Sequence, residues 1–290
     1  MNDRRFNVLL SFAALVIVFI FAGFLFTLVV QSLPAAKQEG AAFLYGSEWN
    51  PVTTRFGALP FIIGTLMTSA IALVIAIPLS LSAGIVMGEY VNSGWVRSVL
   101  NTLINVLASI PSVVFGLWGI EVVIPLVRKL ALLVGAPPYG AGILSASLVL
   151  AIMIIPYMSS MTREALVNVP AGLREGAFAL GLTKQEVVTG IALPFAKKSI
   201  FAGILLSLGR ALGETMAVTM LIGNATRIPK SLFSLGNTLA SVIASQFNEA
   251  ASEVHRSAMM GLALILLVIT MIAGWFGRTL MSKGMGAYGK

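Results

Sequence analysis

The sequence has 290 residues, of which 58% are hydrophobic and only 10% are charged. Soluble domains are about 25% charged, so a cytosolic enzyme and a disordered protein are both excluded. The net charge of +8 is distributed between long apolar runs, which indicates a membrane protein with basic loops and excludes a nucleic-acid-binding protein. The lack of cysteine and the single histidine, His255, exclude thiolate and multi-histidine metal sites.

The apolar runs predict an all-α polytopic membrane protein with six transmembrane helices in one domain over residues 1–290. A helix needs about 20 apolar residues to cross a bilayer, and six segments of that length occur. They cover residues 8–30, 58–87, 99–126, 141–161, 199–222 and 258–281. The first has an uncharged run longer than a signal-peptide core and a poor cleavage site after it, so we interpret it as a retained anchor. Pro78, Pro111 and Pro156 lie inside three of these segments and predict kinks.

The basic residues predict the topology. With six spans, one side carries Arg4, Arg5, Arg97, Arg163, Arg174, Lys184, Lys197, Lys198, Arg278, Lys283 and Lys290. The other side carries Lys37, Arg55, Arg128, Lys129, Arg227, Lys230 and Arg256. Because basic loops are retained in the cytoplasm, this bias places both termini there. Four aromatic residues near the inner ends fit interfacial anchors, although core packing explains the third equally well; they are Tyr90, Trp95, Tyr157 and Trp275.

Two predicted outer segments, residues 31–57 and 225–257, are long enough to fold back on themselves. Trp49 and Phe247 are available to pack within them. Composition leaves two interpretations open, a docking surface for an external partner and ordinary solvated loops.

The longest polar stretch, residues 162–198, lies on the predicted cytoplasmic side. Apolar residues recur there at three- and four-residue spacing, which predicts an amphipathic helix with Arg174 and Glu175 turned away from the apolar stripe. The stripe consists of Leu166, Val169, Leu173, Ala177 and Leu180. Gly181 is expected to end this helix, and Thr183 is expected to cap a second one with Glu186 at its third position.

Glu175-Gly176-Ala177, then Gly181, then Ile191-Ala192-Leu193-Pro194 resembles the EAA loop of importer-type ABC transporter permeases in residue type and spacing. In that family the loop inserts a coupling helix into a groove on a separate ATPase subunit. The resemblance therefore assigns ATPase coupling to Glu175, Gly176, Ala177 and Gly181. Gly176 replaces the usual alanine, at a cost of about 1 kcal/mol in helix propensity, which would soften the coupling helix. A chance amphipathic segment between two spans is the alternative.

Two charges, Arg210 and Glu214, lie within the fifth apolar segment. Each costs about 2.5 to 3.5 kcal/mol at the centre of a membrane helix, so both must face the bundle or a wet cavity. Four residues apart, they are expected on one helix face and able to pair. Two hydroxyl donors lie nearby, Thr215 and Thr219. Two glycines four residues apart, Gly209 and Gly213, would let another helix approach closely. The pair either fixes helix packing only, or Arg210 lines the pathway of an oxyanion while Glu214 holds Arg210 or switches partners during the transport cycle.

Several stretches together resemble the C-type subunit of the phosphate-specific ABC transporter permeases, from near residue 8 to near residue 280. They are Arg210–Val218, Ile222–Asn224, Ser109–Gly119, and Phe43-Leu44 with Trp49-Asn50. The resemblance implies the type I importer permease architecture in a bacterial or archaeal cytoplasmic membrane. It also implies three partners: a second homologous permease, a dimeric cytoplasmic ATPase and an external phosphate-binding protein. In that family the pair matching Arg210 and Glu214 is implicated in transport, and we add Thr215 to the expected pathway.

No complete G-x-x-x-x-G-K-[S/T] phosphate loop is present, so ATP and Mg are expected on the partner ATPase, with no cofactor or metal on this chain. One arginine does not discriminate between oxyanions, which leaves a molybdate or sulfate permease as an alternative. An ion-coupled secondary transporter with Glu214 as the coupling acid is less favoured, because no inverted repeat is visible. An intramembrane enzyme is disfavoured, since His255 is expected to stand alone and solvated in an outer loop.

Overall fold

The computed structural model describes residues 3–91 and 94–283, with side chains from residue 7 to residue 279. The α-helices are α1 (Asp3–Glu39), α2 (Ala42–Tyr45), α3 (Leu59–Ile85), α4 (Trp95–Ser109), α5 (Ser112–Trp118), α6 (Ile124–Leu133), α7 (Ile143–Val167), α8 (Ala171–Ala179), α9 (Lys184–Val187), α10 (Leu193–Gly213), α11 (Met216–Leu221), α12 (Leu239–Gln246) and α13 (Glu253–Lys283). Of the residues used to predict topology, Lys290 lies outside the described residues, as do the side chains of Arg4, Arg5 and Lys283.

Short elements of other types join these helices. They are the π-helical η1 (Val86–Tyr90), η2 (Gly119–Val123) and η3 (Val188–Ala192), the 3-10 turn η4 (Phe247–Glu249), and strands β1 (Trp49–Asn50) and β2 (Arg55–Phe56). The two strands form an antiparallel hairpin in which Trp49 lies opposite Phe56.

The predicted all-helical class is confirmed. Among the described residues, five helices are long and apolar enough to cross a membrane, and one bent pair brings the number to six.

The bent pair replaces the third predicted span, residues 99–126, which is therefore not one straight helix. Helix α4 and the segment Ser112–Leu133 meet at an angle of 94°. The break falls at Ile110, whose backbone is extended, and at Pro111, which precedes α5. Proline disfavours helical backbone at the residue before it, which explains the position of the break. Pro78 and Pro156, in contrast, lie inside the continuous helices α3 and α7.

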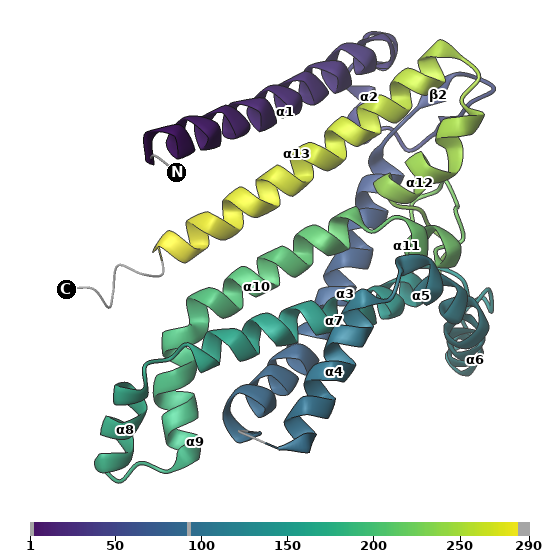
Figure 1. The fold of residues 1–290 in the computed structure, drawn as a ribbon. Helices are drawn as coiled ribbons and strands as arrows, with labels where there is room; N and C mark the ends of the chain where they lie inside the picture. Colours follow the sequence, from purple (N-terminus) through teal and green to yellow (C-terminus); the bar gives the residue numbers. More distant parts are fainter. Residues whose placement is uncertain (1–2, 92–93, 284–290) are drawn as a thin grey trace.

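Helices α3 and α7 pack along each other at the centre of the molecule (Figure 1). The approach is close because glycine faces the neighbouring helix: a Cβ atom on Gly84 would lie 2.5 Å from Cβ of Thr162. One turn further, a Cβ on Gly88 would lie 3.2 Å from Cβ of Leu166. Apolar side chains of α3, α7 and α10 bury one another around this contact, among them Ala72, Ala76, Leu150, Ile154 and Ala211. Dispersion and small residues hold such helices together in a membrane.

The fifth predicted span, residues 199–222, is also interrupted. Helix α10 ends at Gly213, Glu214 has extended backbone, and a short helix, α11, starts at Met216. The apolar run therefore continues beyond the end of the helix that carries Arg210. This break forms one edge of the candidate site described below.

The two predicted outer segments pack against each other at one end of the molecule. Trp49 is 6% exposed, lies edge-on to Phe56 with ring centroids 4.9 Å apart, and donates a hydrogen bond to Oε1 of Gln246 (2.9 Å). His255 stacks on Phe56 at 5.2 Å and is 5% exposed, so the prediction of a solvated histidine is wrong. The reason is that the hairpin and the start of α13 enclose it. Phe247 is still 37% exposed.

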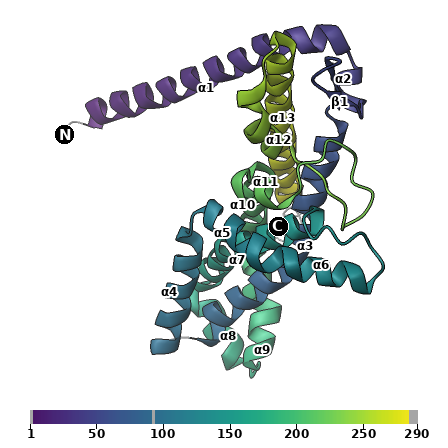
Figure 2. The ribbon, with the colours of Figure 1, turned by 90° about the vertical axis from the view of Figure 1, so that its right-hand side faces the viewer.

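The elements of residues 162–198 lie at the opposite end. Helices α8 and α9 are far from α2, the β-hairpin and α12 in both views (Figures 1 and 2). The C-terminal part of α1 runs beside α13. Figure 2 shows that the N-terminal part of α1 points away from the other helices. Almost none of the apolar stretch of α1 is buried. Its side chains are therefore available to lipid or to another membrane helix.

Candidate functional site

Arg210 lies in the last turn of α10, and Glu214 follows the helix end rather than continuing it. Nη2 of Arg210 is 4.0 Å from Oε2 of Glu214, so the predicted pair is present at the outer limit of an ion pair. The expectation that both residues share one helix face is wrong, because the chain leaves the helix after Gly213. The carboxylate approaches the guanidinium from the extended segment instead. Its side chain is 9% exposed and that of Arg210 is 35% exposed.

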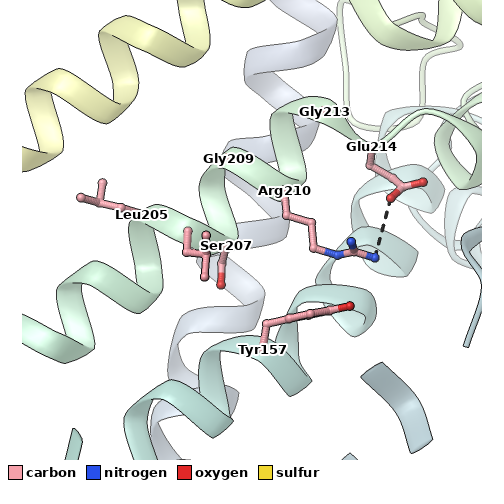
Figure 3. A pocket seen from close by; sticks show the side chains of 8 residues that line it. Tyr157, Leu205, Ser207, Gly209, Arg210, Gly213 and Glu214 are labelled. Atoms are coloured by element: carbon pink, nitrogen blue, oxygen red, sulfur yellow. Dashed lines mark ion pairs between the residues drawn. The ribbon is translucent and has the colours of Figure 1, made fainter. Parts of the chain in front are cut away.

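The pair faces a cavity of about 560 Å³ between α10 and α7 (Figure 3). Its lining consists of Tyr157, Leu205, Leu206, Ser207, Gly209, Arg210, Gly213 and Glu214. The guanidinium carbon of Arg210 lies 4.6 Å from the ring centroid of Tyr157, within cation–π distance. The hydroxyl of Tyr157 donates to the carbonyl of Ala108 on α4 at 3.0 Å, which fixes the ring. Sequence reasoning weighed Tyr157 only as an anchor or as core packing and missed this contact, because the two residues are far apart in the chain.

Among the described residues that line the cavity, Arg210 is the one cation and Glu214 the one anion. A guanidinium offers planar donors that match the oxygens of phosphate and carboxylate groups. Nε of Arg210 is buried without a hydrogen-bond partner, so the cation is incompletely satisfied. Because the surroundings are largely apolar, water screens the charge less than it would at a surface.

The two threonines contribute less than expected. Thr215 Oγ1 donates to the carbonyl of Gly213 at 3.1 Å, and Thr219 Oγ1 donates to the carbonyl of Thr215 at 2.7 Å. Both hydroxyl protons are therefore used by the backbone around the helix break. Neither threonine lies among the described residues that line the cavity.

Gly209 and Gly213 line the open side of the cavity. A Cβ atom added to either glycine would meet no atom within 4 Å. The close helix approach that their spacing predicts is therefore not made within the described part of this chain. The face remains open beside Arg210.

The loop expected to couple to an ATPase forms two short helices, α8 and α9, as predicted, but the first starts later than predicted. Pro170 separates α7 from α8, so Leu166 belongs to α7 and the predicted continuous helix is wrong. Gly181 ends α8 as predicted, with φ +84°, and its amide donates to the carbonyl of Phe178 (2.9 Å). The capping box of Thr183 and Glu186 is confirmed at the start of α9.

Helix α8 presents one exposed face. Glu175 and Gly176 are exposed, whereas Ala177 is 3% exposed and turns inward. Leu180, predicted to belong to the packed stripe, is instead 84% exposed. The exposed apolar and acidic side chains of this helix are available to another protein.

Arg174 was expected to point away from the packed side, and this prediction is wrong. Its Nη2 lies 2.7 Å from Oε1 of Glu89 in η1, and the same nitrogen donates to the carbonyl of Leu166 at the end of α7. The Glu89 side chain is 6% exposed. No local signal in the sequence could have found a pair of residues separated by 85 positions. An acidic residue at the end of an apolar segment was the only hint.

Comparison with known proteins identifies the family and the fold of this chain. Residues 80–283 match the family described as binding-protein-dependent transport system inner membrane component. A bacterial alginate ABC transporter has a chain of similar fold, with a TM-score of 0.66 and 18% identity over 96% of this chain and 97% of that one. A chain of the inward-facing MetNI methionine ABC transporter has a TM-score of 0.59 and 19% identity over 76% and 92%. The fold and the family together define an inner-membrane permease component of an ABC importer, which is not itself an enzyme.

Two sequence relatives give the family more narrowly. The phosphate transport system permease protein PstC of Pasteurella multocida (strain Pm70) is 40% identical over 287 residues, which cover 94% of this chain and 89% of that protein. The protein of the same name from Haemophilus influenzae is 39% identical over 292 residues, which cover 96% and 92%. The chain belongs to this family of phosphate transport system permease proteins. The resemblance noted in the sequence is thereby confirmed.

Proposed function

We propose that this chain is the membrane-spanning subunit that translocates inorganic phosphate in an ATP-driven importer, with Arg210 in the pathway. The observation that carries the proposal is the placement of Arg210 in a largely apolar cavity, between the Tyr157 ring and the Glu214 carboxylate. A charge in such surroundings is costly, and its presence there therefore favours a functional role. The names of the relatives supply the identity of the anion.

The looseness of the pair suggests how it works. At 4.0 Å, Glu214 neutralises Arg210 without a short hydrogen bond, so an arriving phosphate can replace the carboxylate with stronger, bidentate contacts. The break between α10 and α11 gives Glu214 room to move, because its backbone is not part of a helix. Departure of phosphate would restore the pair. Glu214 then acts as an exchange partner that keeps the cation neutral when the pathway is empty.

The family membership supports a complex of several subunits. We propose a second homologous permease against the open face of Gly209 and Gly213, and a dimeric ATPase on the exposed face of α8, including Glu175 and Gly176. An external phosphate-binding protein would deliver the anion at the end of the molecule that carries α12. ATP and Mg would be bound by the ATPase, and both termini would lie in the cytoplasm. ATP binding would bias the helices between inward and outward states.

The geometry of the cavity does not distinguish phosphate from other oxyanions. Sulfate and molybdate also present oxygens to a guanidinium, so Arg210 by itself does not select phosphate. We propose that the binding protein provides the selectivity, and that the cavity accepts whichever anion it is given. Competition with unlabelled sulfate and molybdate during phosphate uptake measures the selectivity of the whole complex.

The test is uptake of radiolabelled phosphate into proteoliposomes that contain the permease pair, the ATPase and the binding protein. Arg210→Ala is expected to lower ATP-dependent uptake at least tenfold, because a charge-assisted hydrogen bond contributes about 1.5 to 3 kcal/mol. Binding of the ATPase and basal ATP hydrolysis should persist, since Arg210 is far from α8. Arg210→Lys is the matched control that keeps the charge but loses the planar fork.

Normal phosphate uptake by Arg210→Ala would contradict the pathway role of this residue. Uptake by the unaltered complex that survives removal of the ATPase and collapses with an ion gradient would contradict the importer itself. The two outcomes are measured in the same vesicles and separate the two parts of the proposal.

A further inference from the structure

The ion pair of Arg174 and Glu89 ties the ATPase-facing helix to the transmembrane core. Arg174 belongs to α8, Glu89 to the π-helical extension of α3, and the accepting carbonyl of Leu166 to the end of α7. One guanidinium thus joins three elements. We propose that Arg174 is a positioning residue that transmits the movement of α8 to α3 and α7, and so couples ATP hydrolysis to transport.

The burial of the pair makes the connection stiff. The Glu89 side chain is 6% exposed and that of Arg174 is 25% exposed, and the two atoms are 2.7 Å apart. Separating them would leave a carboxylate in an apolar environment without water or a partner, which is strongly unfavourable. Helix α8 therefore cannot move away from α3 without a large cost. It is easier for Glu89, and the helix that carries it, to follow.

Most of the rest of α8 and its C-cap Leu180 are open. Leu173, Phe178 and Leu180 are 45%, 49% and 84% exposed. A force applied by a protein bound there would pass through α8 to the inward-facing guanidinium. A second contact supports the same connection, because Nζ of Lys184 at the start of α9 lies 4.9 Å from the ring centroid of Tyr90 in η1.

The path from Glu89 to the cavity is equally tight. Glycine at position 84 brings α3 so close to α7 that a Cβ there would lie 2.5 Å from Cβ of Thr162. The two helices therefore move as one packed unit. Helix α7 carries Tyr157, whose ring contacts Arg210. The contacts run without a gap from the coupling helix to the cation of the proposed pathway.

This inference rests on the proposed function, and its test measures both separately. In the reconstituted complex, phosphate uptake and ATP hydrolysis are recorded together, and their ratio is the coupling. For Arg174→Met we expect the ratio to fall at least fivefold while hydrolysis stays within twofold of the unaltered complex. Glu89→Gln should behave in the same way. The exchange of charges, Arg174→Glu with Glu89→Arg, should restore at least half of the ratio.

Lys198→Met is the matched control, because it removes an exposed positive charge from the same end of the molecule. Its ratio should stay within twofold of the unaltered value. An unchanged ratio in Arg174→Met would overturn the proposal. If that variant fails to assemble, Arg174→Lys decides: it keeps the charge without the fork, and a ratio lowered at least twofold supports the proposal, whereas an unchanged ratio overturns it.

Failure of the proposed function gives a different result. In that case the unaltered complex shows no ATP-dependent phosphate uptake, and no ratio exists to compare. A drop in the ratio of the variants, set against active unaltered complex, concerns only Arg174 and Glu89. The two failures are thus distinguished within one experiment.

Discussion

The chain contains two Arg–Glu pairs that are built in opposite ways. Arg174 and Glu89 lie 2.7 Å apart and come from segments far apart in sequence, and Arg174 also donates to the backbone carbonyl of Leu166. Arg210 and Glu214 lie 4.0 Å apart, come from one segment, and face a cavity. The tight pair fits the proposed role of a joint, a connection between helices that stays closed. The loose pair fits the proposed role of a site, in which Arg210 exchanges Glu214 for the transported anion. The distance between the charged atoms separates these roles where residue type does not.

The largest expected contrast is in stability. Arg174→Met leaves the buried carboxylate of Glu89 alone and should lower the free energy of unfolding by about 3 to 5 kcal/mol. Arg210→Met removes a partner that is already 4.0 Å from Glu214, so its cost should be smaller, about 1 to 3 kcal/mol. Unfolding of both variants in detergent micelles, followed by circular dichroism, measures the difference. Equal costs would remove the distinction between joint and site.

A smaller effect is expected at the ring beneath Arg210. Tyr157→Leu removes the cation–π contact, which contributes about 1 kcal/mol, so phosphate uptake should fall roughly fivefold. Tyr157→Phe keeps the ring and loses only the hydrogen bond to Ala108. Its uptake should stay within about twofold of the unaltered complex. If phosphate uptake falls as far in Tyr157→Phe as in Tyr157→Leu, the hydroxyl, rather than the ring, positions Arg210.

The smallest effect concerns the coupling helix itself. Gly176 is an exposed interior position of α8 with open space around it, so Gly176→Ala should stabilise the helix by up to about 1 kcal/mol. Amide hydrogen exchange within α8 should slow accordingly, and coupling should not decrease. Gly181→Ala is the contrasting variant, because φ +84° strains any side chain there, and exchange should become faster. Faster exchange in Gly176→Ala would contradict the open environment.

Local chemistry could be predicted well from the sequence. The apolar runs identified the helical class, Gly181 identified the end of α8, and Thr183 with Glu186 identified the capping box, because each of these depends on residues within one or two turns. The pairing of Arg210 with Glu214 was also within reach of local reasoning, although its geometry was not.

Long-range contacts could not be predicted in this way. Pro111 lies at the break of its segment while Pro78 and Pro156 lie inside continuous helices, a difference that the local effect of proline does not predict. His255 is buried because a hairpin far earlier in the chain stacks against it.

Composition by itself thus determined that this chain is a helical membrane protein, and the resemblance of its motifs to a known family indicated a permease. Tertiary structure alone decided that Arg174 turns inward to Glu89, that Tyr157 lies beneath Arg210, and which face of α8 stays open. The physical reason is the separation along the chain over which each interaction acts. Helix propensity, capping and hydropathy act between neighbours in the chain, whereas burial of a charge depends on whichever distant segment folds against it.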